Sequence, residues 1–230
     1  MLCVPIDHGV TNANIVNLAN FKALSESLVS NGATALIVHK GMVRFLPNLR
    51  QTGLIVHISV STEKQQEVNK KVACDVLEAV QLGADAISIH VNIGNKYEQE
   101  MLVDLGFISS ECQKYGMPLL VMVYIRNEEN IDISTPAYTK HAIRIVTELG
   151  ADIVKIAFNR DVKELEEIVK ESLVPIVIAG GDYNENVKEF YKRSEDLMTT
   201  GILGISVGRN VFKSKNPDVT MKQLYSIVYK

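Results

Sequence analysis

Eight short apolar runs recur along the chain, and the stretches between them space their apolar residues differently. Each run is rich in Ile, Val, Leu or Ala, which is typical of a strand buried on both faces. The runs cover residues 2–6, 35–39, 54–59, 86–90, 118–124, 152–156, 175–180 and 203–208. We predict a buried strand in each of them.

The stretches between the runs carry apolar residues at steps of three and four, the spacing that places side chains on one face of a helix. The longest such stripe consists of Tyr97, Met101, Leu105, Ile108, Cys112 and Tyr115. Shorter or less regular stripes consist of Phe21, Leu24 and Leu28, and of Val187, Phe190, Tyr191, Leu197 and Met198. We predict helices that pack these stripes against a sheet. The connection over 41–48 leaves room only for a short helix.

A repeated unit joins the predicted helices to the predicted strands. It reads "NGATALIVH" at 31–39, "LGADAISIH" at 82–90, "LGADIVKIA" at 149–157 and, more loosely, "TGILGISVG" at 200–208. Its glycine suits the left-handed residue that ends many helices. Alternating strands and helices indicate a parallel sheet. Eight such units in 230 residues fit one (β/α)8 TIM barrel domain over 1–230, with a doubly wound open sheet as the main alternative.

Composition and charge exclude several classes of protein. The net charge of −3 gives no basic field for nucleic acid or an acidic membrane surface. No apolar run reaches the roughly 18 to 20 residues that span a bilayer, and no signal peptide is predicted. Three scattered cysteines, Cys3, Cys74 and Cys112, fit neither a disulfide framework nor a metal site. We expect a cytoplasmic protein in a reducing compartment.

Polar side chains collect at the ends of the predicted strands, which in a barrel form the catalytic face. Four of the five histidines follow this pattern. Each residue alone fits a structural role, such as a hydrogen-bonded scaffold or an exposed loop cation. Their convergence from six strands favours an active site. The residues are Asp7, His8, His39, Lys40, His57, His90, Asn92, Tyr124, Arg126 and Lys155.

The last two predicted strands end differently, in "AGGDYN" and "VGRN". Gly180, Gly181 and Gly208 let backbone amides approach an anion closely. Arg209 adds a charge-assisted contact. Phosphate binding by the loops after the seventh and eighth strands recurs in this architecture. We therefore predict a phosphate site here, rather than glycines that serve only to form turns.

Lys155 lies inside an apolar run, where an ammonium is costly to bury. Counted from the glycine of each repeat, Lys155 takes the position that Ile37 holds in another repeat, and we expect this position to face inward. Partial desolvation and nearby Lys40 and Arg126 favour the neutral amine, a nucleophile toward ketones and aldehydes. Asp7 and Tyr124 are the candidate acid and base. A charged Lys155 paired with Asp7 is the structural alternative.

The motifs "PIDHGV", "VHKGMVR", "GLIVHIS", "LGADAISIHVNIG", "GMPLLVMVY", "LGADIVK", "IAGG" and "GISVGRNVF" together resemble the class I aldolases of the archaeal fructose-bisphosphate type. The likeness is greatest to the branch of 2-amino-3,7-dideoxy-D-threo-hept-6-ulosonate synthases. It implies a (β/α)8 barrel, a homo-oligomer (decamers built from rings of five) and no metal or other cofactor.

Carried over by position, the resemblance implies a Schiff-base lysine at Lys155, with Tyr124 and Asp7 as acid-base residues. It implies phosphate binding by Gly180, Gly181, Gly208 and Arg209 and a phosphorylated sugar as substrate. Because they follow or end predicted strands, we also expect substrate contacts from His8, His39, His90, Lys40 and Arg126. Neither nucleic acid nor membrane is expected as a partner.

Three departures from the family pattern put the substrate in doubt. Ile125, Arg126 and Asn127 replace a common Pro-Arg-Gly, and Ile156 and Ala157 replace small hydroxyl residues. Asp182 and Tyr183 follow the glycine pair, and an acidic side chain beside a phosphate is unfavourable unless it points away or is neutralised.

Several functions remain open from the sequence. The leading one is a Schiff-base aldolase or transaldolase, with aspartate semialdehyde in an aromatic-precursor pathway as the acceptor. The first alternative is fructose-bisphosphate aldolase chemistry, with glyceraldehyde 3-phosphate as the acceptor. The second alternative is thiolysis of a phosphorylated signalling molecule. A non-covalent phosphosugar isomerase or epimerase leaves the position of Lys155 unexplained. A barrel that only binds a phosphorylated metabolite is the last alternative.

Overall fold

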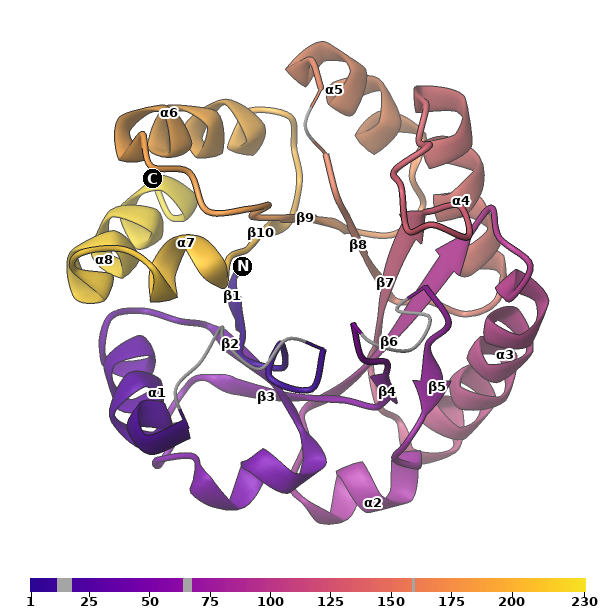
Figure 1. The fold of residues 1–230 in the computed structure, drawn as a ribbon, viewed down its shortest axis with the longest axis horizontal. Coiled ribbons are helices and arrows are strands. Elements are labelled where there is room, and N and C mark those ends of the chain that lie inside the picture. Colours follow the sequence, from indigo (N-terminus) through magenta and orange to yellow (C-terminus); the bar gives the residue numbers. More distant parts are fainter. Residues whose placement is uncertain (12–17, 64–67, 159) are drawn as a thin grey trace.

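The computed structural model describes residues 1–11, 18–63, 68–158 and 160–230. Eight parallel strands close into a barrel in it, because β1 pairs with β10 (Figure 1). This confirms the predicted (β/α)8 barrel and excludes the open sheet. In ring order the strands are β1 (Leu2–Pro5), β2 (Ala35–His39), β3 (Gly53–His57), β6 (Ala86–Ile93), β7 (Leu119–Ile125), β8 (Ile153–Ile156), β9 (Ile176–Ala179) and β10 (Gly204–Ser206).

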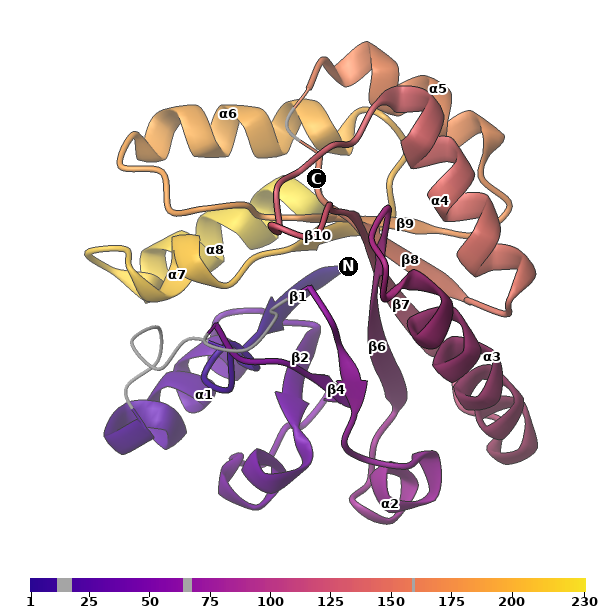
Figure 2. The same cartoon turned by 45° about the vertical axis from the view of Figure 1, so that its right-hand side comes forward.

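Helices surround the barrel on the outside (Figures 1 and 2). Several begin at a side chain that accepts a hydrogen bond from the first turn, as Asp75, Thr135, Asp161, Asn186 and Asn216 do. The helices are η1 (Leu18–Asn20), α1 (Phe21–Ser30), η2 (Lys40–Phe45), α2 (Val76–Gln81), α3 (Glu98–Tyr115), α4 (Pro136–Glu148), α5 (Val162–Glu171), α6 (Val187–Met198), α7 (Arg209–Phe212) and α8 (Pro217–Val228).

The predicted helical stripes are largely buried, with exceptions at helix ends. Tyr115 is exposed because it is the last residue of α3, which ends at left-handed Gly116. Val187 is exposed as the first residue of α6. The short helix expected after the second strand is the 3-10 helix η2.

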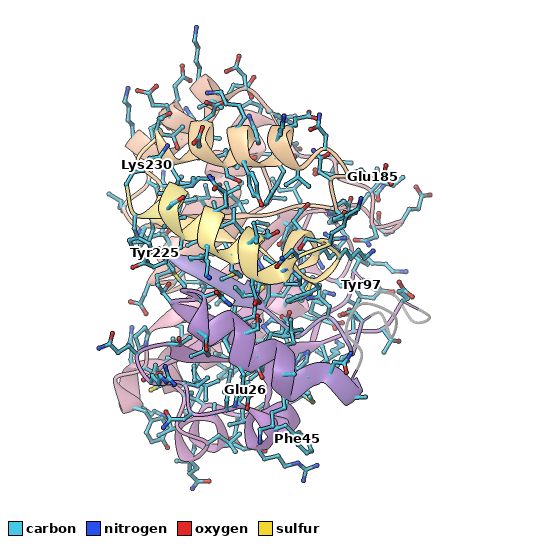
Figure 3. All side chains as sticks on the ribbon, turned by 90° about the vertical axis from the view of Figure 1, so that its left-hand side faces the viewer. Glu26, Phe45, Tyr97, Glu185, Tyr225 and Lys230 are labelled. Carbon is cyan, nitrogen blue, oxygen red and sulfur yellow. The ribbon has the colours of Figure 1, made fainter. Side chains whose placement is uncertain are left out.

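The first and last helices meet on one side of the barrel, where α8 lies beside α1 (Figure 3). Ser27 of α1 donates a hydrogen bond to Asp218 of α8. The ring of Tyr225 packs on Gly32, where a Cβ would collide with it. The outer layer is therefore closed across the seam between the first and last units.

A two-stranded antiparallel hairpin interrupts the connection between β3 and α2. It pairs β4 (Ser59–Val60) with β5 (Lys71–Val72). The sequence pattern did not predict this hairpin, because each of its strands has only two residues. The pattern assigned Ser59 to the preceding apolar run instead. The hairpin lies against the end of β6, since Ser59 Oγ accepts a hydrogen bond from the His90 amide at 2.9 Å.

Two apolar clusters divide the core. The larger one lies between the strands and the surrounding helices. The smaller one fills the barrel interior and consists of Cys3, Ala35, Ile37, Ile55, Leu120 and Met122. Lys155 is in register with Met122, so its side chain points into the same interior, as the repeat predicted.

No helix within the described ranges is both long and apolar enough to cross a membrane.

Candidate active site

A cavity of about 320 Å³ opens at the carboxyl ends of the barrel strands. Most of its wall is polar, and it brings together residues from β2, β3, β6, β7 and β8 and from the segments that follow β1 and β10. The residues that line it are Asp7, His8, Thr11, His39, His57, Ser59, Ser61, Glu63, Lys70, His90, Asn92, Met122, Tyr124, Arg126, Asn130, Lys155 and Arg209.

Lys155 lies at the bottom of this cavity, on a strand held between two neighbours. It is only 6% exposed, and its Nζ lies 3.7 Å from Met122 Sδ. Among the residues that the structure describes, no carboxylate oxygen comes within 4.0 Å of this nitrogen. The predicted alternative of a Lys155–Asp7 ion pair is therefore not formed. A buried ammonium without such a partner is costly, which suits an amine that reacts as a nucleophile.

Asp7 follows β1 and faces the barrel axis. Burial acts to raise the pKa of its carboxyl, but electrostatic interactions with His57, His8 and Lys155 outweigh burial and lower that pKa. Its Oδ1 lies 3.5 Å from His8 Nδ1. Asp7 is therefore a carboxylate at neutral pH, within electrostatic reach of the lysine.

Three histidines line the cavity wall on β2, β3 and β6. His57 Nδ1 lies 2.9 Å from Ser88 Oγ, and its ring centre lies 5.3 Å from that of His39. His90 Nε2 lies 2.9 Å from Asn92 Oδ1. Burial lowers the pKa of His57 to about 3 and lowers the pKa of His90 well below its usual range. His57 and His90 are therefore neutral imidazoles that offer hydrogen bonds rather than charge.

Tyr124 stands next to Lys155 on the adjacent strand β7. Met122 is in register with Lys155, so Tyr124 lies two residues nearer the mouth on the same face. Its ring centre lies 4.8 Å from that of His90 and 6.0 Å from the Arg126 guanidinium carbon. Around the ring, β7 lies opposite β1, so Tyr124 and Asp7 approach the lysine from different sides.

The glycine loops after β9 and β10 lie side by side. Gly181 has a φ of 70°, which glycine adopts without strain. A Cβ on Gly208 would come within 2.9 Å of His8 Cε1 and 3.0 Å of Pro5 O, so glycine is required there. The Gly180 amide donates to Ser206 O at 2.8 Å, so it is already used by the barrel. Within the glycine pair, that leaves Gly181 as the better candidate for an anion contact.

Asn210 joins these two loops, a role that sequence reasoning missed. Its Nδ2 donates to Gly180 O at 2.9 Å and to Asp182 O at 2.8 Å. Its Oδ1 accepts from the Asn184 amide at 2.8 Å. The only available signal was the asparagine that directly follows "GR" in the eighth unit.

Arg209 lines the cavity and forms an ion pair with Asp182. The acidic residue that looked unfavourable beside a phosphate is therefore neutralised by the arginine predicted to bind that phosphate. Asp182 itself is highly exposed. A phosphate can replace the Asp182 carboxylate in this pair, because both are anionic oxygen acceptors for the Arg209 guanidinium.

Lys40 directly follows β2, as the sequence predicted, but its side chain pairs with a helix residue. It begins η2, and its Nζ lies 2.9 Å from Glu78 Oε2 of α2. It is absent from the described cavity wall. The prediction that Lys40 faces the substrate and adds positive charge beside Lys155 does not fit this position. Arg126 does line the cavity, and its Nη1 donates to Asn130 O at 3.3 Å.

Lys70 and Ser61 belong to the cavity but were not predicted. Lys70 is 8% exposed, and its Nζ donates to Ser61 Oγ at 2.6 Å. Both lie in the connection from β3 to α2, whose length was the one available signal, since long connections in compact domains are often functional.

Metal ligands do not cluster in the described part of the chain. No group of three or more His, Cys, Asp or Glu residues there has a geometry that would hold an ion. The three cysteines are free and buried.

The structure is thus a (β/α)8 barrel with a polar cavity at the carboxyl ends of its strands and a buried lysine at the bottom of that cavity. Residues 1–214 match the model of the DeoC/LacD family aldolases. The chain is 41% identical to 2-amino-3,7-dideoxy-D-threo-hept-6-ulosonate synthase 1 of Archaeoglobus fulgidus, over 98% of this chain and 85% of that protein. It is 31% identical to 2-amino-4,5-dihydroxy-6-oxo-7-(phosphonooxy)heptanoate synthase of Streptomyces griseus, over 100% of this chain and 85% of that protein. The chain belongs to the DeoC/LacD aldolase family.

A solved structure of an aldolase has the same fold as this chain. An archaeal fructose-1,6-bisphosphate aldolase, whose catalytic Lys is covalently bound to the carbinolamine intermediate of its substrate, matches with a TM-score of 0.91. The match has 26% identity and covers 100% of this chain and 94% of that chain. The predicted enzyme class, an aldolase, is confirmed.

Proposed function

We propose that Lys155 is the Schiff-base residue of a class I aldolase or transaldolase that acts on a phosphorylated ketone donor. The observation that carries this proposal is a buried amine with no carboxylate within 4.0 Å among the described residues, at the bottom of a polar cavity. Its relative of known structure holds a carbinolamine on its catalytic Lys.

The reaction follows from the chemistry of an amine and a ketone. Lys155 Nζ adds to the donor carbonyl carbon, and the carbinolamine loses water to give an iminium ion. The iminium withdraws electrons, so the bond between the adjacent carbon and the hydroxyl-bearing carbon breaks once the hydroxyl proton is removed. An aldehyde leaves, and an enamine remains on Lys155. Attack of that enamine on a second aldehyde forms a new carbon–carbon bond, and water then releases the product.

Asp7 and Tyr124 move the protons in this proposal. A carboxylate at neutral pH accepts a proton from the substrate hydroxyl, while a phenol donates one to the departing carbinolamine oxygen. Their strands lie on opposite sides of the ring, so the two groups reach different atoms of one bound substrate. Arg209 and the Gly181 amide bind the donor phosphate.

Aspartate semialdehyde is the proposed acceptor. The relative at 41% identity is named for a seven-carbon product that carries a 2-amino acid at one end and a ketone near the other. An acceptor aldehyde that contains the amino acid supplies that end. Glyceraldehyde 3-phosphate is the second candidate, favoured by the structural match to a fructose-1,6-bisphosphate aldolase.

Borohydride trapping tests the covalent step. The protein is mixed with dihydroxyacetone phosphate or fructose 1,6-bisphosphate and reduced, and the modified peptide is located by mass spectrometry. We expect the mass of the reduced donor on Lys155 and none in Lys155→Ala. Lys140→Ala is the matched control, because Lys140 is a surface lysine paired with Glu171. An unmodified Lys155, with activity retained in Lys155→Ala, would refute the proposal and favour a non-covalent isomerase.

Two further predictions concern the whole protein. The family resemblance supports a homo-oligomer, which light scattering coupled to size-exclusion chromatography tests. Three free, buried cysteines fit a reducing cytoplasm, which localisation of the tagged protein in its own cells tests.

A further inference from the structure

His39 is the last residue of β2, and its ring is oriented by the neighbouring strand β3. Its Nδ1 lies 3.0 Å from the carbonyl oxygen of His57, the residue in register with it. A carbonyl oxygen only accepts hydrogen bonds, so Nδ1 is the donor in this pair. In the neutral ring the proton is therefore on Nδ1, and the lone pair is on Nε2.

The Nε2 of His39 is an acceptor that a bound molecule can reach. His39 lines the cavity, and none of the described residues forms a hydrogen bond with this nitrogen. The described side-chain atoms that are both enclosed and unpaired do not include it. It is therefore an open acceptor in the cavity wall.

The other two histidines of this wall use their nitrogens differently. Both nitrogens of His57 meet hydroxyl oxygens, at 2.9 and 3.4 Å. His90 Nε2 donates to Asn92 Oδ1, because the Asn92 amide nitrogen itself donates to a carbonyl. That leaves His90 Nδ1 open, but the His90 ring lies against Tyr124 on the side of β7. Of these three histidines, His39 is the one whose open nitrogen lies on the side of β1.

Asp7 stands beside His39 without being bonded to it. Pro5 is in register with Ile37, and Ile6 N continues the pairing of these strands by donating to Ile37 O at 2.8 Å. Two residues beyond this pair, Asp7 is level with His39 on the same face. Among the described residues, no carboxylate oxygen lies within 4.0 Å of a His39 nitrogen. Two neighbouring acceptors thus face the cavity, and a molecule with hydrogen-bond donors suits them both.

A hydroxyl is the donor that fits this position better than an ammonium does. Arg126 and Arg209 also line the cavity and repel a cation. An ammonium would in addition pair with Asp7 and engage the base of the proposed reaction. A hydroxyl donates to an imidazole nitrogen without bringing a charge.

The proposed reaction says which hydroxyl this is. Asp7 takes the proton of the hydroxyl on one side of the bond that breaks. The carbon on the other side of that bond is next to the ketone. A hydroxyl on this carbon is the direct neighbour of the one at Asp7, so it lies within reach of the adjacent strand β2.

We propose that His39 determines donor specificity, because its Nε2 accepts a hydrogen bond from the hydroxyl on the carbon next to the donor ketone. This inference rests on the proposed function for the position of the ketone, and on the contacts of His39 for the acceptor. The protein then selects phosphorylated α-hydroxy ketones over their deoxy analogues. His39 binds the substrate and moves no proton.

Dihydroxyacetone phosphate and hydroxyacetone phosphate differ by this one hydroxyl, so the pair tests the contact. Calorimetric titration of Lys155→Met measures the binding of both ketones without the covalent step. We expect the hydroxylated ketone to bind about 3- to 10-fold more tightly, as expected for one hydrogen bond. When His39→Asn is added, the two ketones should bind equally.

Two substitutions of His39 separate substrate binding from support of the fold. The Asn amide can replace Nδ1 as the donor to His57 O but does not reach the place of Nε2, whereas Gln can place an acceptor there. We expect His39→Asn to abolish the preference and His39→Gln to keep part of it. The reverse order, or equal losses for both ketones, would show that the ring only supports the fold.

A full preference in His39→Asn would assign the hydroxyl to Asp7 and overturn the proposal. His141→Asn is the matched control, because His141 is exposed on α4. It should bind both ketones as its parent does.

Borohydride trapping of the chain that retains Lys155 is a second measurement, which serves if Lys155→Met binds neither ketone. The concentration for half-maximal labelling of Lys155 should be lower for dihydroxyacetone phosphate, and His39→Asn should remove that difference. Equal concentrations for the two ketones before any change to His39 would contradict the proposal.

The outcomes separate this inference from the proposed function. A preference that depends on His39, with no adduct on Lys155, would refute the Schiff base and leave the hydroxyl contact in place. Adducts on Lys155 from both ketones, with no preference between them, would do the reverse.

Discussion

Lys155 and Arg209 both face the cavity, but the molecule holds them in opposite ways. Lys155 lies on β8, hydrogen-bonded on both sides, and is 6% exposed. Arg209 begins a four-residue helix in the loop region, and its side chain is 35% exposed and paired with Asp182. The bottom of the cavity is fixed by strands, whereas its rim is held by contacts that a ligand can replace.

The difference indicates which step each region serves. A nucleophile gains from a fixed position in a poorly hydrated place, because reorganisation costs are avoided during the reaction. A phosphate-binding arginine must release one partner to take another, and an exposed ion pair costs little to break. Changes at the bottom should therefore alter turnover, and changes at the rim should alter binding.

The largest expected effect comes from Lys155→Met. Without the amine no iminium forms, so we expect kcat to fall by about 10³-fold or more. Thermal unfolding should change little or shift upward, because an apolar side chain of similar volume replaces a buried polar group. Steady-state assays and calorimetric melting measure both. Retained turnover would place the nucleophile elsewhere.

Tyr124→Phe should have the next largest effect. Loss of one acid-base group is expected to lower kcat by about 10²-fold or more. Because Lys155 is untouched, its borohydride adduct should still form, more slowly, which mass spectrometry over time measures. Tyr138→Phe is the matched control, since Tyr138 is exposed on α4. Equal kcat in Tyr124→Phe and wild type would contradict the assigned role.

At the rim, Arg209→Met and Asp182→Asn should act in opposite directions. We expect Arg209→Met to raise KM for the phosphorylated donor by about 10- to 100-fold, with a smaller change in kcat. Asp182→Asn frees the guanidinium and should lower KM by a few-fold, the small value of an exposed pair. A KM that rises in both variants would show that the pair itself builds the site.

The smallest effect to resolve is the acid sensitivity contributed by His57. Unfolded histidine has a pKa of about 6.5, whereas that of folded His57 is about 3. Between these values only the unfolded chain takes up the proton, so stability is present above pH 6.5 and is lost as the pH falls. The expected slope is about 1.4 kcal/mol per pH unit from this residue.

Urea unfolding at several pH values measures that slope. His57→Asn should reduce it over the window from about pH 6 to 4. His141→Asn should leave it unchanged, because His141 is exposed on α4. An unchanged slope in His57→Asn would mean that another group carries the acid sensitivity.

The bottom of the cavity was far easier to predict from sequence than the rim. A lysine or histidine inside an apolar run must face either the barrel or the helices, and the period of two along a strand settles which. Lys155, Tyr124 and His57 were found in this way.

The contacts that the sequence did not predict have one cause in common. Lys70 lies next to a second lysine in an aperiodic stretch, and only a hairpin of two-residue strands buries it. Lys40 directly follows a predicted strand, yet Glu78 from a helix many residues later pairs with it outside the described cavity wall. Asn210 acts through backbone carbonyls of another loop. Each depends on a long-range contact that local spacing does not encode.

The carboxamide of Asn210 sets the spacing between two neighbouring loops at once. Lengthening either loop alone would break bonds to the other, so we expect the two loops to change together in evolution. A graft meant to change donor preference would need to transplant both loops and this asparagine as one cassette.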